Sequence, residues 1–212
     1  MFVADWMTKK VVTVTTDNSI AEAIKMMKEK GVKHLPVVDG ANKVMGILSD
    51  RDIKEYTPSK VSSFEVRELN YILFTTKVKA IMKKKVVTSR PDMPIEEAAM
   101  VMLDHDIGSL PVVDDGKLIG IISDKDLFRV LIDITGVREG GARFALTLKD
   151  RPEVTKDVLD IVKKYGFGIE AVLTGYSGVK HGYKRVVVRT KGKGDKAAAE
   201  KELKEVFAVP YM

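Results

Sequence analysis

The clearest chemical signal in the chain is a serine followed three residues later by an aspartate, and it occurs twice. Ser49-Asp50-Arg51-Asp52 and Ser123-Asp124-Lys125-Asp126 each follow a short apolar run that contains Gly-Ile. Such a pair can form a capping box, which satisfies two backbone N–H groups at the start of a helix. The same carboxylate can also accept hydrogen bonds from a cis-diol, and serine beside helix N-terminal N–H groups suits a phosphate oxygen. Both interpretations stay open and are compatible.

The two tetrapeptides end two copies of a longer repeat. Residues 7–40 and 82–115 are identical at 16 of 34 aligned positions, and 44–52 and 118–126 at 5 of 9. Each copy begins with a β-rich segment, continues as an amphipathic helix, and then forms two strands joined by a turn with Asp and Gly. The predicted segments are β-rich starts at 11–14 and 86–88, helices over 19–30 and 94–105, strands at 35–38, 44–48, 110–113 and 118–122, and last helices from Ser49 and Ser123.

The β-α-β-β-α order, the Leu-Pro-Val-Val-Asp strand and the Gly-x-x-Ser-x-x-Asp ending resemble the CBS motif, here in tandem over residues 1–135. The resemblance implies a pseudo-two-fold module with two clefts, where members of the family bind AMP, ADP, ATP or S-adenosylmethionine. It assigns the ribose to Asp52 and Asp126, and it puts the adenine beside the backbone near Thr13-Val14 and Thr88-Ser89.

The resemblance also implies that side chains of the opposite repeat reach the phosphate tail, which makes the two clefts unequal. Because Arg can clamp a phosphate with two hydrogen bonds and Lys adds a charge, the Asp126 cleft is expected to bind more tightly. An alternative for His34 is a half-buried histidine at the start of a strand. The stronger cleft is predicted to contain Thr88, Ser89, Ser123, Asp126, Lys33, His34 and Arg51, and the weaker cleft Thr13, Val14, Ser49, Asp52, Ser109 and Lys125.

The last third of the chain has a different pattern. Strands are predicted at 143–149, 168–174 and 183–190, with helices from 150–152 to Tyr165 and over 195–206, and a closing tail at 207–212. This βαββαβ order is ferredoxin-like. With Asp150-Arg151-Pro152 at the first strand–helix turn, the segment resembles an ACT domain and implies an amino-acid effector loop there. The family usually has glycine where this chain has Glu153, so a dimerisation domain is the alternative.

The expected fold class is therefore α+β, with a tandem CBS pair followed by an ACT-type domain. This layout resembles proteins described as acetoin-utilisation regulators. The predicted divisions are a first CBS motif at 1–56, a segment packed on the pair at 57–78, a second motif at 79–135, a linker at 136–142, and the ACT-like domain at 143–212.

Composition excludes several function classes. The chain has no cysteine and three histidines, none of which is spaced to bind a metal with another or lies beside a candidate nucleophile. No Walker-type or dinucleotide-binding glycine loop occurs. We therefore expect no catalytic residues, no metal and no required cofactor, with an adenine nucleotide as a regulatory ligand. A structural adaptor with vestigial clefts is the main alternative, and amino-acid sensing through the ACT-like domain is another.

Charge and hydropathy narrow the partners. The formal charge is +6, but the lysines are interleaved with acids and aromatic residues make up only 7% of the chain, which favours solvated faces over a nucleic-acid interface. Neither a signal peptide nor an apolar run of eighteen residues occurs, so a cytoplasmic protein without a membrane partner is expected. We also predict a homodimer and a regulated protein partner that the sequence does not name.

Overall fold

The computed structural model describes residues 1–57 and 65–207. Two compact units divide the chain, Met1–Leu127 and Phe128–Met212. The division lies inside helix α6 (Asp124–Ile134), ahead of the segment 136–142 that the sequence analysis proposed as the linker. Ala142 is tied to the second unit, because the Thr190 N–H donates to the Ala142 carbonyl and the Ala142 N–H donates to the Thr190 hydroxyl.

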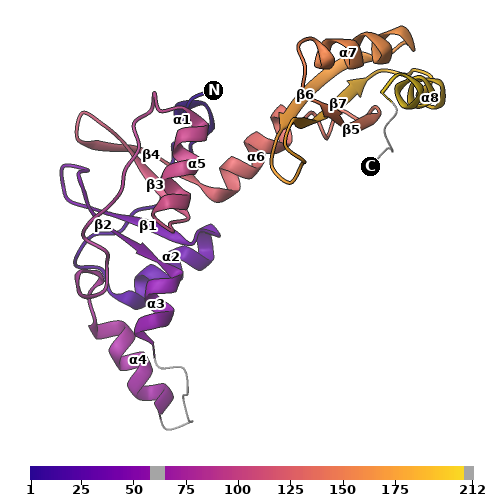
Figure 1. Ribbon diagram of the computed structural model, residues 1–212. Helices are drawn as coiled ribbons and strands as arrows, with labels where there is room; N and C mark the ends of the chain where they lie inside the picture. The colour runs from indigo at the N-terminus through magenta and orange to yellow at the C-terminus, as the bar shows by residue number, and fades with distance from the viewer. Residues whose placement is uncertain (58–64, 208–212) are drawn as a thin grey trace. The chain divides into compact units, whose positions relative to one another are not determined.

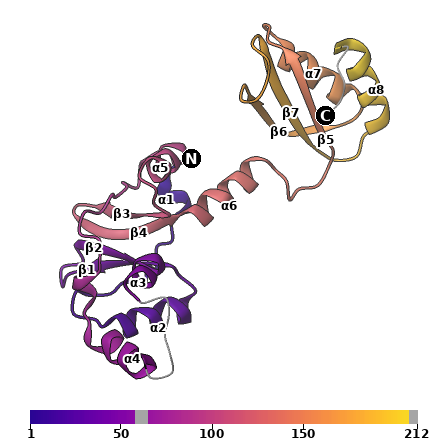
Figure 2. The same cartoon turned by 60° about the horizontal axis from the view of Figure 1, so that its bottom comes forward.

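The first unit contains both repeats, each built around one antiparallel hairpin (Figures 1 and 2). The predicted helices and hairpin strands of each repeat are present, and the segment between the repeats is partly helical, as expected. The elements in chain order are α1 (Val3–Trp6), α2 (Ile20–Lys30), β1 (His34–Val38), β2 (Val44–Ser49), α3 (Asp50–Tyr56), α4 (Glu65–Thr75), a 3-10 turn (Val78–Ala80), α5 (Ile95–Asp104), β3 (Ser109–Asp114), β4 (Lys117–Ser123) and α6.

The β-rich starts predicted at 11–14 and 86–88 are not strands. Val14 forms a single parallel bridge to Val37 in β1, and Ser89 forms the matching bridge to Val112 in β3. Two backbone hydrogen bonds hold Val14 between Pro36 and Val38, and two more hold Ser89 between Pro111 and Val113. Proline follows the leucine in both hairpin strands and has no N–H to donate, so the ladder does not extend.

The first repeat has a clear local core. Ser19 accepts a hydrogen bond from the Glu22 N–H, and Glu22 accepts one from Ser19, so a capping box begins α2. The buried face of α2 packs against the hairpin and Val78. The core residues are Val14, Ile20, Ala23, Met27, Leu35, Val37, Leu48, Ile53 and Val78.

The segments that begin the repeats cross over to the opposite hairpin. Thr8 of repeat one bridges to Ile121 in β4, and Lys83 of repeat two bridges to Ile47 in β2. Glycine makes these crossings possible, since a Cβ on Gly46 would lie 2.7 Å from the Met82 sulfur and 3.0 Å from the Lys83 carbonyl oxygen. A Cβ on Gly120 would lie 2.3 Å from the Met7 sulfur. This crossing decides which segment lines which cleft.

The second unit is a three-stranded antiparallel sheet with two helices on one face. The strand order is β5–β7–β6, and one buried core joins the sheet to both helices. The order β-α-β-β-α matches the first five elements of the predicted pattern, and the sixth, in the tail, extends beyond the described residues. The elements are β5 (Arg143–Lys149), α7 (Val154–Lys164), β6 (Gly168–Gly175), β7 (Tyr183–Lys191) and α8 (Lys196–Phe207).

Two ion pairs involve residues of the predicted effector loop of this unit. The Asp150 carboxylate lies 3.2 Å from Lys184, and Arg151 lies 2.7 Å from Asp157. Helix α7 begins at Val154, later than the predicted start at 150–152, because Glu153 adopts a left-handed conformation with φ of 66°. Glycine favours this conformation, which costs other residues about 1–2 kcal/mol.

Candidate functional site: a pocket between the two repeats

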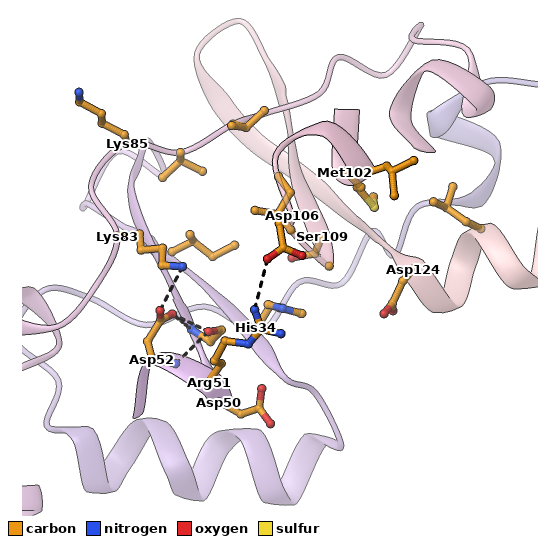
Figure 3. Close-up of a pocket in the computed structure, with 18 of the residues that line it drawn as sticks. His34, Asp50, Arg51, Asp52, Lys83, Lys85, Met102, Asp106, Ser109 and Asp124 are labelled. Carbon is orange, nitrogen blue, oxygen red and sulfur yellow. Dashed lines mark hydrogen bonds and ion pairs between the residues drawn. The ribbon is translucent and has the colours of Figure 1, made fainter. Parts of the chain in front are cut away.

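One pocket of about 530 Å³ lies between the hairpins of the first unit (Figure 3). The end of β2 and the start of α3 form one side, and the segment at 83–87, helix α5 and the start of β3 form the rest. Polar and apolar side chains are both present, as expected of a small-molecule site. The lining comprises His34, Ile47, Ser49, Asp50, Arg51, Asp52, Lys83, Lys85, Val86, Val87, Ala99, Met102, Leu103, Asp106, Ile107, Gly108, Ser109, Asp124 and Leu127.

The Asp52 carboxylate uses its two oxygens differently. The Ser49 backbone N–H and hydroxyl both donate to Asp52 Oδ2, at 2.7 and 2.5 Å, and the Asp52 N–H donates to Ser49 Oγ at 3.1 Å. The capping box that the sequence left open is thus formed. Asp52 Oδ1 instead lies 3.4 Å from the Lys83 ammonium (Figure 3). The residue is only 8% exposed, and the cap holds its position, while Oδ1 lies outside the cap and faces the exposed Lys83.

Ser109 supplies a second polar group without a partner. It is the first residue of β3 and is 3% exposed, and its hydroxyl has no hydrogen-bond partner among residues 1–57 and 65–207. A buried hydroxyl without a hydrogen bond costs about 1–3 kcal/mol. Because Ser109 lines the pocket, a ligand oxygen in the pocket would satisfy it.

The charged groups at the meeting point of the repeats come from both. Arg51 of α3 lies 3.7 Å from Asp106, which follows α5, so an ion pair joins the two repeats (Figure 3). His34 lies against Gly108, where its Cε1 would be 3.1 Å from an added Cβ. Burial lowers the pKa of His34, although the charges of Asp124, Asp50 and Asp52 oppose the shift. The imidazole is therefore mainly neutral near pH 7.

The structure brings together a different set of residues from the one the sequence analysis expected. Ser49, Asp52 and Ser109, predicted for one cleft, do line one pocket. The same pocket also contains His34 and Arg51, which the sequence analysis had assigned to the other cleft. This reverses the expected distribution of positive charge, because the Asp52 pocket contains the arginine.

The adenine-side segments are also exchanged. The segment at 83–87 lines the Asp52 pocket, where Thr13 and Val14 were expected. Val14 is instead buried in the core of repeat one, and Ser89 is buried beside β3 and donates its hydroxyl to the Arg90 carbonyl. The cause is the crossover of the two segments, which a comparison of one repeat with the other does not reveal.

The second tetrapeptide has a similar local geometry. The Ser123 N–H and hydroxyl donate to Asp126 Oδ2, at 2.9 and 2.7 Å, and Asp126 is buried. The crossing segment with Thr8 bridges to β4 next to this site. The other residues predicted for the two clefts, Lys33, Thr88 and Lys125, are exposed.

Several lining residues were missed from sequence. Lys83 and Lys85 are among the lysines that the sequence analysis interpreted as solvated, and Asp106 was not singled out. The signal that could have found Lys83 is Gly46, because a glycine inside a strand often marks the close approach of another backbone. Asp106 comes from a turn and has no motif of its own.

The described parts of the chain show neither a candidate metal cluster nor a membrane-spanning helix. No group of three or more His, Asp or Glu residues there could hold a metal ion. None of the described helices is long and apolar enough to cross a membrane.

Comparison with known proteins identifies the family of the first unit. The CBS domain model matches residues 3–59 and 78–133, which together are more than half of the chain. The chain therefore belongs to the CBS domain family and contains a tandem CBS pair. Residues 134–212 lie outside the two matched segments.

Solved structures agree with this assignment. The CBS pair of protein MJ0100 in complex with 5′-methylthioadenosine and S-adenosylmethionine matches with a TM-score of 0.52 and 29% identity, covering 62% of this chain and 95% of that one. CBSX2 in complex with AMP matches at 0.54 and 30%, covering 63% and 97%. A Vibrio cholerae protein described as an acetoin utilization protein (AcuB) matches at 0.54 and 29%, covering 66% and 96%.

Curated relatives include much longer proteins. A homoserine O-acetyltransferase of Methanohalobium evestigatum is 36% identical over 131 residues, which are 61% of this chain and 24% of the relative. The chain thus spans about a quarter of the length of this relative.

Proposed function

We propose that this protein is a regulatory module that binds an adenosine compound in the Asp52 pocket and signals through rearrangement of its repeats. The observation that carries the proposal is the pairing, in one pocket, of two buried groups. Asp52 is a carboxylate whose Oδ1 lies outside the cap beside the exposed Lys83, and Ser109 is a hydroxyl without a described partner. A ligand that offers hydroxyls and oxygens would donate to the Asp52 carboxylate and accept from the Ser109 hydroxyl.

The chemistry of the pocket suits each part of such a ligand. Asp52 Oδ1 accepts hydrogen bonds from the ribose hydroxyls, and the Lys83 ammonium moves aside to solvent. The adenine packs on the apolar lining formed by Val86, Val87 and Ile107. The ribose supplies the oxygen that the Ser109 hydroxyl lacks, and the 5′ substituent points to Arg51. Ser49 acts through the cap, because its hydroxyl is donated to Asp52.

Relatives support the ligand class and the regulatory role. The similar structures contain AMP, or 5′-methylthioadenosine with S-adenosylmethionine. The acetyltransferase name does not extend to this chain, since the match covers 24% of that protein. We therefore propose a ligand-binding protein without catalytic activity of its own, and the Asp126 cleft as a second and weaker site.

Thermal unfolding with a panel of AMP, ADP, ATP, S-adenosylmethionine and 5′-methylthioadenosine tests the proposal. A ligand at 100 times its dissociation constant adds about 2.7 kcal/mol to the folded state. A rise in Tm that Asp52→Ala abolishes supports the proposal. No rise with any member of the panel would favour the adaptor with vestigial clefts.

We also propose a homodimer in which the β6 edges of two chains pair. Strand β6 is an edge of the sheet, and its Val172 and Leu173 side chains are exposed. Exposed apolar edge strands favour pairing with another chain. A monomeric mass by light scattering at tens of micromolar contradicts this arrangement. The ion-paired loop at Asp150 and Arg151 makes dimerisation a better proposal for this unit than amino-acid binding.

A further inference from the structure

We infer that the Asp52 pocket selects adenosine compounds whose 5′ substituent has no phosphate, such as a thioether or a sulfonium, over nucleoside polyphosphates. The inference rests on the proposed function and names the ligand class of the same pocket. It follows from the charges around the 5′ end of the ligand, which are set by the residues where the two repeats meet.

The lining offers a phosphate little positive charge. Four carboxylates line the pocket, against one arginine and two lysines. Arg51 is paired with Asp106 and Lys83 with Asp52, so two of the three cations already have an acidic neighbour. The third, Lys85, points away from Arg51 and Asp106 in Figure 3.

The neighbouring groups do not change this balance. Asp50 is ion-paired with Lys54 at 3.1 Å, and the exposed Lys33 is the other cation near it. His34 is a neutral group near pH 7, because burial lowers its pKa. Asp106 and Asp124 thus face the 5′ end with Arg51 as the single lining cation between them. Each phosphate added to a ligand must compete with Asp106 for that arginine.

The backbone at Asp106 adopts a conformation that is unusual for a residue with a side chain. Asp106 has a φ of 50°, and the corresponding residue of repeat one is Gly31, with a φ of 64°. The turn thus adopts the left-handed conformation that suits glycine, yet here it carries a carboxylate. That largely exposed carboxylate lies 3.7 Å from Arg51, so the second repeat places an acidic group beside the arginine for which a phosphate would compete.

Calorimetric titration of the full chain with 5′-methylthioadenosine, S-adenosylmethionine, AMP and ATP tests the inference. We expect the two compounds without phosphate to bind more tightly than AMP, and AMP more tightly than ATP. The difference should shrink as salt increases, because it is electrostatic.

The matched variants are Asp106→Asn and Asp124→Asn. The control is Asp104→Asn, because Asp104 ends helix α5 close to Asp106 but does not line the pocket. Each of the first two should raise the affinity for ATP by about two- to fivefold, the range for exposed charges, and leave that for 5′-methylthioadenosine within twofold. Asp104→Asn should change neither. Equal Tm values for the three variants confirm that they are folded.

The outcomes separate the two proposals. Binding of ATP as tight as that of 5′-methylthioadenosine, or no effect of Asp106→Asn and Asp124→Asn on ATP, overturns the inference while the proposed function stands. Binding of none of the four compounds removes the proposed function itself.

Discussion

The two repeats carry nearly the same Ser-x-x-Asp tetrapeptide in different surroundings. Asp52 and Asp126 are both buried and both accept hydrogen bonds from the serine three residues earlier. Asp52, however, faces Lys83, and the aligned residue beside the second site is Thr8. The motif therefore fixes the local geometry of the carboxylate, while the residues that cross over from the other repeat decide its electrostatic environment.

The two repeats also contribute different side chains where they meet. Ser109 aligns with His34, Gly108 with Lys33, and Asp106 with Gly31. The pseudo-symmetry therefore holds for the backbone but not for the side chains at the centre. Two clefts with equal motifs should bind ligands with unequal affinity and selectivity.

The largest expected effect is the difference in lost binding affinity between substitutions of Asp52 and of Asp126. Asp52→Ala should weaken binding of the preferred adenosine compound by roughly 10- to 150-fold, since hydrogen bonds to a charged group contribute about 1.5–3 kcal/mol. Asp126→Ala should affect only a weaker second site. Calorimetry measures both the affinity and the stoichiometry.

Ser49→Ala is the control for the loss of the cap. It removes the acceptor of the Asp52 N–H and should cost about 1 kcal/mol of stability, as Asp52→Ala also does, but it leaves the carboxylate in place. If Ser49→Ala weakens binding as strongly as Asp52→Ala, the tetrapeptide is a structural cap alone.

The next effect compares the two glycines where the segments cross. Gly46→Ala should lower the free energy of unfolding by about 1–3 kcal/mol, because the added Cβ overlaps Met82 and approaches the Lys83 carbonyl. Since the segment at 83–87 lines the Asp52 pocket, this variant should also weaken ligand binding. Denaturant unfolding and calorimetry report the two effects separately.

Gly120→Ala is its counterpart in repeat two. The added Cβ meets the flexible Met7 side chain, so stability should fall while the affinity of the Asp52 pocket is retained. Gly40→Ala, where an added Cβ meets no atom within 4 Å, should leave both unchanged. Equal loss of affinity in Gly46→Ala and Gly120→Ala would show that the crossing segments do not define separate clefts.

The sequence predicted the elements well and the site only in part. Local patterns such as the capped helix at Ser19 and the hairpin with Leu35 depend on neighbouring residues, so their periodicity is visible in the chain. Asp52 was found because it belongs to the repeat, and Ser109 because the CBS resemblance implies that side chains of the opposite repeat reach the cleft. The contacts of Lys83 and Arg51 depend instead on which repeat each segment reaches, and that is a long-range property without a local signal.

In the C-terminal unit, too, the sequence predicted the regular elements but not a feature that the surrounding fold imposes. Alternation of apolar residues predicted β5, β6 and β7 to within one or two residues. The start of α7 was missed because Glu153 has a left-handed backbone, which the sequence Pro-Glu-Val does not indicate. Local strain of this kind is tolerated only because the surrounding fold imposes it.

A smaller effect on stability is expected at the turns that follow α2 and α5, the matching helices of the two repeats. Gly31→Asp should lower the free energy of unfolding by about 1 kcal/mol, which is about 2–4 °C in Tm, because the backbone is left-handed there. No atom lies within 4 Å of an added Cβ, so the cost is one of backbone strain alone. Gly40→Asp has equal space without a positive φ and is the control. An unchanged Tm for Gly31→Asp would mean that the turn relaxes, and that Asp106 is equally unstrained.

The smallest effect concerns pH and belongs to one cleft, since Ser109 replaces His34 in the other repeat. Burial lowers the pKa of His34 in the folded state, whereas in the unfolded chain it is near 6.5. As the pH falls from 7 to 5, the unfolded chain therefore binds this proton more readily than the folded protein, and stability is lost. His34→Asn should lose less stability over this interval than the parent protein, with His181→Asn, on an exposed loop, as the control. Guanidinium unfolding at pH 7, 6 and 5 measures the difference. Identical pH dependence in the parent and in His34→Asn would show that the charges of Asp124 and Asp50 offset the burial of the imidazole, and that the central charges of this cleft are more favourable to a cation than burial alone suggests.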